Sequence, residues 1–451
     1  MSQNLELNRK AFLKSAGVTA VLGAVGARPA LATTETNGVP PTLLYPTYDF
    51  DELYDRVGTD CSKWDSPIVT YGEDIEVAMG IADMDFRAAP CVTKALAERC
   101  AHENWGYLRR PESYIQSIVD FNKRRYDLDI DPGSIVLNTG VHAGLISALQ
   151  TFAPPGSRVL MTTPIYSGFY SDLRYTRTVP EESLMKLVDG RYSIDFEDFE
   201  RRARRCNAFI LCNPQNPTGN LWSAEDMTRM GEICLEHRVV MLVDEIHCDF
   251  VRSGELYIPF ASLPNGEIVD NSLTFKSASK SFSISGMKAA WFFSTNRDYL
   301  ARVRENSRAD LNTLGMVATR AALIEGDEWL DESLVYLDGN HEFAEAYIRE
   351  SIPLVKYTKA RGTYLAWVDV SEVVERIGAE SIAAEENATS EEQVTPERIV
   401  QRWFAENARV YLNPGSSYGT GGAGRMRMNL ATTRALVERA LGNMASALAR
   451  I

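Results

Sequence analysis

The chain has 451 residues, of which 45% are hydrophobic and 24% are charged, so it is an ordinary globular chain that is long enough for two domains. Its net charge of -14 disfavours both a nucleic-acid partner and an anionic membrane surface. The five histidines and seven cysteines show no metal-ligand spacing, and we predict no metal site. The odd, scattered cysteines indicate buried free thiols rather than a disulfide framework.

The N-terminus has the features of a targeting segment. A basic stretch at 8–14 precedes a mildly apolar run at 15–27 and a small-x-small cleavage site at 30–32. This order resembles a bacterial twin-arginine export signal in which Lys10 replaces the second arginine. The run is too short and too rich in Gly and Ala for a stable membrane span. We predict that 1–32 directs export to the periplasm or the cell exterior; a disordered tail on a cytoplasmic protein is the alternative.

Short apolar runs alternate with longer helical patterns through the middle of the chain. The runs at 159–161, 208–211, 239–243 and 273–275 are those of strands buried on both faces. This alternation indicates an α/β domain. Near residue 327 the pattern changes to long helices with few strands, which indicates a second, smaller domain.

These changes of pattern divide the chain into four parts. After the signal come a linker and arm at 33–86, a large domain at 87–326 and a small C-terminal domain at 327–451. Within the small domain, 380–397 is acidic and polar, which predicts a mobile excursion.

A lysine in a serine-rich stretch follows the run at 273–275. Ligands of open α/β sheets bind beyond the carboxyl ends of the strands, where Lys280 would lie. Its amine could form a Schiff base with an aldehyde cofactor. The hydroxyls of Ser277 and Ser279 and the charge of Lys288 could hold a phosphate. Taken alone, such a lysine is more often a solvated side chain.

Two other motifs also follow strand-like runs. The segment 138–144, Asn-Thr-Gly-Val-His-Ala-Gly, opens a helical pattern, and small residues there leave backbone N–H groups free for a phosphate. A simple strand-to-helix turn is the alternative. In the segment 163–170, Tyr166 could stack on an aromatic cofactor ring, or it could be ordinary partly buried packing.

Polar residues at three further positions fit the same kind of site. Asn216 lies in an Asn-Pro-Gln-Asn-Pro-Thr-Gly turn, whose prolines fix the backbone around an amide donor. Asp244 ends an apolar run and needs a cation when buried, which a protonated pyridine nitrogen would supply; a helix N-cap is the alternative. Arg427 could grip a carboxylate with two donors, or be a surface ion-pair partner.

The order and spacing of these motifs resemble the fold-type I pyridoxal-phosphate enzymes, the aspartate aminotransferase superfamily, from about residue 48 to the end. Within it, the chain is most similar to the class II subgroup of C–S lyases, the cystathionine β-lyases of the maltose-regulon-modulator type and the cysteine-S-conjugate β-lyases. The resemblance implies an α/β fold, with a mostly parallel seven-stranded sheet between helices in the large domain and a smaller α+β C-terminal domain. The subgroup segments are 49–51, 55–59, 63–65, 81–86, 105–107, 362–367 and 414–415.

The resemblance also implies pyridoxal 5'-phosphate as cofactor and gives each residue a role. Lys280 matches the Schiff-base lysine, Asp244 the partner of the pyridine nitrogen and Tyr166 the ring-stacking tyrosine; these three are the predicted catalytic residues. Asn216 matches the donor to the ring oxygen, and His247 lies near that oxygen. The predicted phosphate cradle comprises Val141, His142, Ser277, Ser279 and Lys288.

Two matched residues concern the substrate and the assembly. Arg427 matches the arginine that holds the α-carboxylate of an amino-acid substrate. Tyr107 matches a tyrosine that reaches the phosphate in the neighbouring subunit, which implies a homodimer.

Three functions are compatible with these residues. The first is a C–S β-lyase, in which Lys280 removes the α-proton of cystathionine, cysteine or an S-substituted cysteine, a thiolate leaves, and pyruvate and ammonia follow. The second is an aminotransferase of class I/II on the same scaffold, with the same catalytic residues. The third is a regulatory binding protein, against which the export signal argues.

Overall fold

The computed structural model describes residues 48–391 and 393–451. The predicted export signal at 1–32 and the first part of the linker, through residue 47, lie outside the described residues. Among the residues that are described, no helix has the combined length and apolar character needed to cross a membrane.

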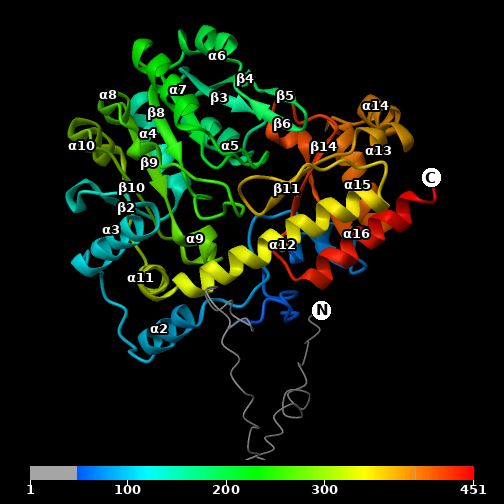
Figure 1. The fold of residues 1–451 in the computed structure, drawn as a ribbon, viewed down its shortest axis with the longest axis horizontal. Coiled ribbons are helices and arrows are strands. Elements are labelled where there is room, and N and C mark those ends of the chain that lie inside the picture. Colours follow the sequence, from blue (N-terminus) through cyan, green and yellow to red (C-terminus); the bar gives the residue numbers. More distant parts are fainter. Residues whose placement is uncertain (1–47, 392) are drawn as a thin grey trace, which may run out of the picture. The chain divides into compact units, whose positions relative to one another are not determined.

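A mixed sheet of seven strands forms the centre of the larger part of the fold (Figure 1). The spatial order is β2-β10-β9-β8-β7-β3-β4, with β10 antiparallel to both neighbours and all other neighbours parallel. The predicted α/β fold with a mostly parallel sheet is therefore confirmed. The strands are β2 (Val136–Asn138), β3 (Arg158–Thr163), β4 (Val179–Leu184), β7 (Ala208–Cys212), β8 (Val240–Asp244), β9 (Ser272–Lys276) and β10 (Ala290–Phe293).

Helices cover both faces of this sheet, which explains why its central strands are apolar throughout. On β8, Leu242 faces one apolar cluster, whereas Met241 and Val243 face another, as the alternation of side chains in a strand requires. The first cluster includes α4 (Val141–Phe152), α5 (Gly168–Thr176) and α10 (Arg297–Asn306). The second includes α6 (Phe196–Ala203), α7 (Ala224–Glu236) and α8 (Gly266–Asp270).

A third apolar cluster lies beside the β2 and β10 edge of the sheet and includes Phe50 and Phe86 of the N-terminal arm. The arm, which precedes the large domain in the sequence, therefore packs against it. The helices of this cluster are α2 (Pro90–Cys100), α3 (Glu112–Tyr126), α11 (Thr313–Glu325) and the first half of α12 (Asp327–Ser351).

The second half of α12 packs in a fourth cluster, the core of the C-terminal part (Figure 1). Strand β1 (Val77–Ala78) of the arm pairs in parallel with β12 (Val410–Tyr411), so both ends of the described chain build this part. An antiparallel sheet of order β11-β14-β13 completes it. The remaining elements here are β11 (Leu365–Asp369), α13 (Ser371–Arg376), α14 (Ala379–Thr389), α15 (Pro396–Ala408), β13 (Asn413–Pro414), β14 (Arg425–Asn429) and α16 (Arg434–Leu448).

The acidic stretch 380–397, for which composition predicts a mobile excursion, contains most of α14 and the start of α15. Ala379 and Ala383 are buried, and Ile382 packs against the same core. These apolar side chains anchor α14 although its other face is acidic. Short elements elsewhere are α1 (Asp65–Tyr71), the β5 (Lys186–Val188) and β6 (Arg191–Ser193) pair, η1 (Pro132–Ser134), η2 (Phe260–Ser262), η3 (Ser285–Met287) and η4 (Gly415–Tyr418).

A buried cluster of charged side chains joins two parts of the arm, residues 56–64 and Asp85. The Asp85 carboxylate lies 2.6 Å from Lys63 Nζ and 2.8 Å from Arg56 Nη1, and it accepts a hydrogen bond of 2.9 Å from Trp64 Nε1. The side chains of Lys63 and Asp85 are 0% and 2% exposed. Burial is the largest single effect and favours the neutral acid, but the charge and hydrogen bond of Lys63, together with Trp64 and Arg56, outweigh it and hold the pKa of Asp85 below its usual range. The carboxylate is therefore charged at neutral pH.

We expect Asp85→Asn to lower the free energy of unfolding by about 3–5 kcal/mol, because it leaves the ammonium of Lys63 buried without a counter-ion. Urea titration followed by circular dichroism measures the change. Since the pKa of Asp85 is lowered on folding, its contribution is present above the unfolded pKa of about 3.9 and is lost as the pH falls through the folded value.

Asp129→Asn is the control, because Asp129 is 84% exposed and pairs with the exposed Lys123. We expect almost no loss of stability from it. Equal losses in the two variants would contradict the role given to Asp85.

Candidate active site

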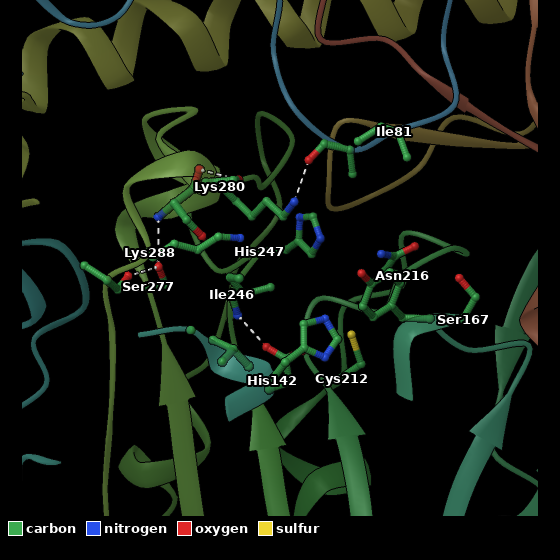
Figure 2. Close-up of a pocket in the computed structure, with 18 of the residues that line it drawn as sticks. Ile81, His142, Ser167, Cys212, Asn216, Ile246, His247, Ser277, Lys280 and Lys288 are labelled. Atoms are coloured by element: carbon green, nitrogen blue, oxygen red, sulfur yellow. Dashed lines mark hydrogen bonds between the residues drawn. The ribbon is translucent and has the colours of Figure 1, made fainter. Parts of the chain in front are cut away.

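A cavity of about 320 Å³ lies beyond the carboxyl ends of the central parallel strands (Figure 2). It receives side chains from the segments that follow β2, β3, β7, β8 and β9, and from β14. All the predicted site residues except Tyr107 line it. The predicted residues in its wall are Val141, His142, Tyr166, Asn216, Asp244, His247, Ser277, Ser279, Lys280, Lys288 and Arg427.

Lys280 lies on the short helix α9 (Ala278–Ser281), which begins directly after β9. The hydroxyl of Ser277 caps this helix by accepting from the Ser279 N–H at 3.0 Å. Lys280 Nζ points across the cavity and donates to the carbonyl oxygen of Ala82 in the arm at 2.5 Å. Burial, reinforced by the charge of Arg427 and opposed by Asp83, lowers the pKa of Lys280 to about 8. A useful fraction of this amine is therefore neutral and nucleophilic near physiological pH.

The predicted phosphate cradle is only partly preformed. The N-terminus of α4, at Gly140 and Val141, and the side chains of Ser279 and Lys288 face the cavity. The hydroxyl of Ser277, in contrast, donates to the carbonyl oxygen of Ala289 at 2.7 Å. It would have to give up this bond to donate to a phosphate, so its assignment stays a prediction.

Asp244 is the last residue of β8 and is 4% exposed. Its Oδ1 accepts from the Ile246 N–H at 3.0 Å, and no lysine or arginine in the described ranges pairs with it. Burial raises the pKa of Asp244 to about 6, while this backbone bond and the charge of His142 oppose the rise. A buried carboxylate in this position is completed by a cationic group in the cavity.

His142 is held by an acid that the sequence reasoning missed. Its Nδ1 lies 2.7 Å from Asp172 Oδ2, and its ring centroid lies 5.6 Å from that of Tyr166. The hydrogen bond to Asp172 raises the pKa of His142 although burial opposes the rise. Asp172 shares the buried face of α5 with Phe169 and Leu173, and an acid on that face was a signal for a buried partner. The imidazole thus faces the cavity with a fixed carboxylate behind it.

Arg427 is 2% exposed and is positioned by β14 between β11 and β13. Its Nη1 donates to Asn216 Oδ1 at 3.1 Å and its Nη2 to the carbonyl oxygen of Gly80 at 2.7 Å. The amide nitrogen of Asn216 is thereby the end that remains available as a donor. Arg427 Cζ also lies 5.2 Å from the ring centroid of Tyr418. The guanidinium is therefore oriented before any ligand binds.

His247 and Tyr107 differ in how closely they relate to this cavity. His247 is buried against Tyr364, with ring centroids 5.7 Å apart, and burial lowers its pKa well below the usual value, so its ring is neutral. Tyr107 is fully exposed on the segment between α2 and α3 and does not line the cavity of its own chain. Its predicted contact with a neighbouring subunit stays a prediction.

Several wall positions were given no individual role in the sequence analysis. Ala82 contributes a backbone carbonyl, and Cys212 contributes a thiol whose pKa burial raises well above its usual value. Ile81, Thr139, Gly140 and Ser167 lie within segments that the sequence analysis did single out. The remaining wall residues are Ile246, Ser285, Ala289 and Asn413.

Comparison with known proteins places this architecture in a defined class. The structure superposes on the pyridoxal-phosphate-bound C-S lyase from Staphylococcus hominis with a TM-score of 0.78 at 30% identity, covering 89% of this chain and 98% of the other. Cystalysin from Treponema denticola, which contains a pyridoxal 5'-phosphate cofactor, gives a TM-score of 0.81 at 25% identity over 89% of this chain and 99% of that protein.

The sequence comparisons agree with this class. The family model for aminotransferase class I and II matches residues 74–444, and the chain belongs to this family. Cystathionine beta-lyase PatB of Bacillus subtilis is 34% identical over 407 residues, which covers 89% of this chain and 100% of PatB. The resemblance drawn from the motifs is confirmed.

The pairing of His142 with Asp172 makes a direct prediction. We expect the pKa of His142 to lie above the unperturbed value of about 6.5 and to fall in Asp172→Asn, because an amide cannot stabilise the imidazolium as a carboxylate does. NMR titration of the imidazole signals, assigned with His142→Gln, measures it. The stabilisation by this pair is present below the unfolded pKa and is lost as the pH rises through the folded one. An unchanged pKa in Asp172→Asn would show that the carboxylate does not set it.

Proposed function

We propose that this chain is a pyridoxal-phosphate-dependent C–S β-lyase. It eliminates the thiol from cystathionine, cysteine or an S-substituted cysteine and yields pyruvate and ammonia. The observation that carries the proposal is the placement of Lys280 and an uncompensated Asp244 in one cavity of a chain that is 34% identical, over 407 residues, to a cystathionine beta-lyase.

The residues present fit this cofactor. The amine of Lys280 suits its aldehyde, the carboxylate of Asp244 suits a protonated ring nitrogen, and Tyr166 offers an aromatic face. The N-terminus of α4 and the charge of Lys288 suit a phosphate. When bound, pyridoxal phosphate supplies an electron sink that stabilises negative charge at the α-carbon of an amino acid.

The side chains of this protein then divide the work between binding and proton transfer. Arg427 binds the α-carboxylate of the substrate and thereby orients its α-carbon. Lys280 Nζ accepts the α-proton, for which its lowered pKa of about 8 suits it. Asp244, which is buried at the end of β8, would favour the protonated form of the ring nitrogen of the cofactor.

The function is tested by measuring pyruvate and free thiol from cystathionine, cysteine and S-alkyl cysteines without any keto acid. We expect stoichiometric pyruvate and thiol. An enzyme that releases neither, but transfers the amino group to an added keto acid, would be an aminotransferase and would overturn the proposal. This result would leave the family membership intact.

The lysine assignment is tested separately. We expect borohydride to attach the cofactor covalently to the wild type and not to Lys280→Ala, because this amine is the group in the cavity that meets the aldehyde. Mass spectrometry of the denatured protein reads the attachment. Lys186→Ala is the control, since Lys186 pairs with Asp195 outside the cavity and should leave the attachment unchanged. Labelling of Lys280→Ala at another lysine of the cavity would refute the assignment.

For Arg427→Lys we expect KM to rise by roughly tenfold to a hundredfold, with a smaller effect on kcat, because an ammonium cannot reproduce the paired donors. Steady-state kinetics with one substrate measures both constants. Arg425→Lys is the matched control, because Arg425 lies on the same strand but pairs with Asp369 at 3.0 Å, away from the cavity. A larger rise in Arg425→Lys would mean that the wrong arginine had been assigned.

The assembly and the location of the protein are also proposals. The exposed Tyr107 and the neighbouring Trp105, which is 51% exposed, support a homodimer in which this segment meets a second copy. Sedimentation of the wild type and of Tyr107→Ala tests it. Export rests on the sequence pattern at 1–32, and fractionation of cells tests it against a cytoplasmic location.

A further inference from the structure

A second cavity, of about 550 Å³, adjoins the active site and has no part in the chemistry described above. The two cavities share Tyr166 and Ser167 in their walls. One side of the second cavity is α5 with the turn before it, and the other side is Arg398 of α15 with the segment 416–419. Figure 2 shows Ser167 well apart from Lys280 across the active-site cavity. The second cavity therefore extends the site away from the reacting amine.

The charge of this second cavity is positive. Arg174 and Arg398 line it from opposite sides, and no aspartate or glutamate is in its wall. Within 48–391 and 393–451 neither guanidinium pairs with a carboxylate, although the chain as a whole carries a net charge of -14. Arg174 Nη2 donates only to Ser171 Oγ, at 2.9 Å. In an acidic protein, these two arginines face the same hollow with their charge not compensated by a described side chain.

Hydroxyl groups share the wall of the second cavity with the two arginines. Ser171 and Ser417 line the cavity, and Ser416, also in the wall, is bonded to Thr395 at 2.7 Å. The nearby carboxylate of Glu182 is occupied at both oxygens, by Tyr170 Oη at 2.7 Å and by Thr420. Two guanidinium groups with hydroxyl donors beside them suit an anion, and a carboxylate in particular.

The position of the cavity indicates which anion it would meet. If Arg427 holds the α-carboxylate and Lys280 takes the α-proton, the substituent on the substrate sulfur has to leave the inner cavity past its wall. Tyr166 and Ser167 form the part of that wall that is shared with the second cavity. A substituent that passes them enters the second cavity, whose wall contains Arg174 and Arg398.

We propose that this second cavity binds the distal group of the S-substituent and selects cysteine S-conjugates whose thiol carries a carboxylate. Arg174 and Arg398 are the specificity-determining residues. This inference rests on the proposed lyase function and adds to it the class of thiol that is released.

The test compares two substrates that differ only in charge, S-(2-carboxyethyl)cysteine and S-(2-carbamoylethyl)cysteine. We expect the wild type to favour the carboxylate in kcat/KM by roughly threefold to tenfold, since two guanidiniums attract it, although both are exposed to solvent. We expect the Arg174→Gln/Arg398→Gln double variant to lose this preference while its kcat/KM for the amide is unchanged. The preference of the wild type should also shrink as salt is added.

The Arg204→Gln/Arg349→Gln double variant is the control for net charge, because it removes the same two charges outside the second cavity, at side chains that are 64% and 66% exposed. It should retain the full preference. Equal kcat/KM for the two substrates in the wild type, or a preference that survives in the double variant, would overturn the proposal.

A binding measurement tests the anion site of the second cavity without turnover. Isothermal titration with 3-(methylthio)propanoate and with the corresponding amide uses ligands that lack the amino-acid part. We expect the acid to bind the wild-type holoenzyme roughly tenfold more tightly than the double variant, and the amide to bind both equally weakly. If neither these conjugates nor cystathionine and cysteine are cleaved, the lyase proposal fails, while tighter binding of the acid to the wild type than to the double variant still supports the anion site. Equal binding of the acid to the wild type and the double variant would refute the anion site, whichever substrates the enzyme cleaves.

Discussion

The buried contact between Asp85 and Lys63 is the constraint on which the active site depends. Both groups are almost without solvent access, so each requires the other, and their pairing holds residues 63 and 85 of the arm together. The arm in turn presents the Ala82 carbonyl to Lys280, and its Gly80 carbonyl receives Arg427. Two side chains from distant parts of the sequence are thus oriented by one short segment. Lys280 lies on the large domain and Arg427 on β14, and the arm orients both because its carbonyl oxygens accept a hydrogen bond from each.

Burial acts on the two principal ionisable groups in opposite directions. It lowers the pKa of the Lys280 ammonium to about 8 and raises that of the Asp244 carboxyl to about 6, because in both cases the charged form is the costly one. The lysine thereby becomes a usable nucleophile and base. The aspartate, in contrast, gains the most from a cation placed beside it. A single physical effect therefore prepares one group to react and the other to bind.

Much of the fold and most of the site could be predicted from the sequence for a physical reason. Strands buried on both faces have to be apolar, so β7 and β8 were visible as runs, and Asp244 and Lys280 were located by what precedes them. Asp172 was not found, because its partner His142 is reached only through the packing of α5 on α4. The contact of Lys280 with the Ala82 carbonyl could not be predicted either, because every residue has a backbone carbonyl and the residue type does not mark this one. In 380–397, a few buried side chains decided the structure against an acidic composition.

The parallel pairing of β1 with β12 has a consequence for the order in which the molecule is made. A ribosome delivers β1 early and β12 only near the end, so the arm cannot take its final place until nearly the whole chain has been synthesised. The central sheet, whose strands lie between residues 136 and 293, has no such dependence and can form first. The hydrogen bonds that Lys280 and Arg427 donate to carbonyl oxygens of the arm therefore form last. A chain that lacks β12 therefore contains the strands of the central sheet and Asp244 but lacks Arg427, which closes the cavity.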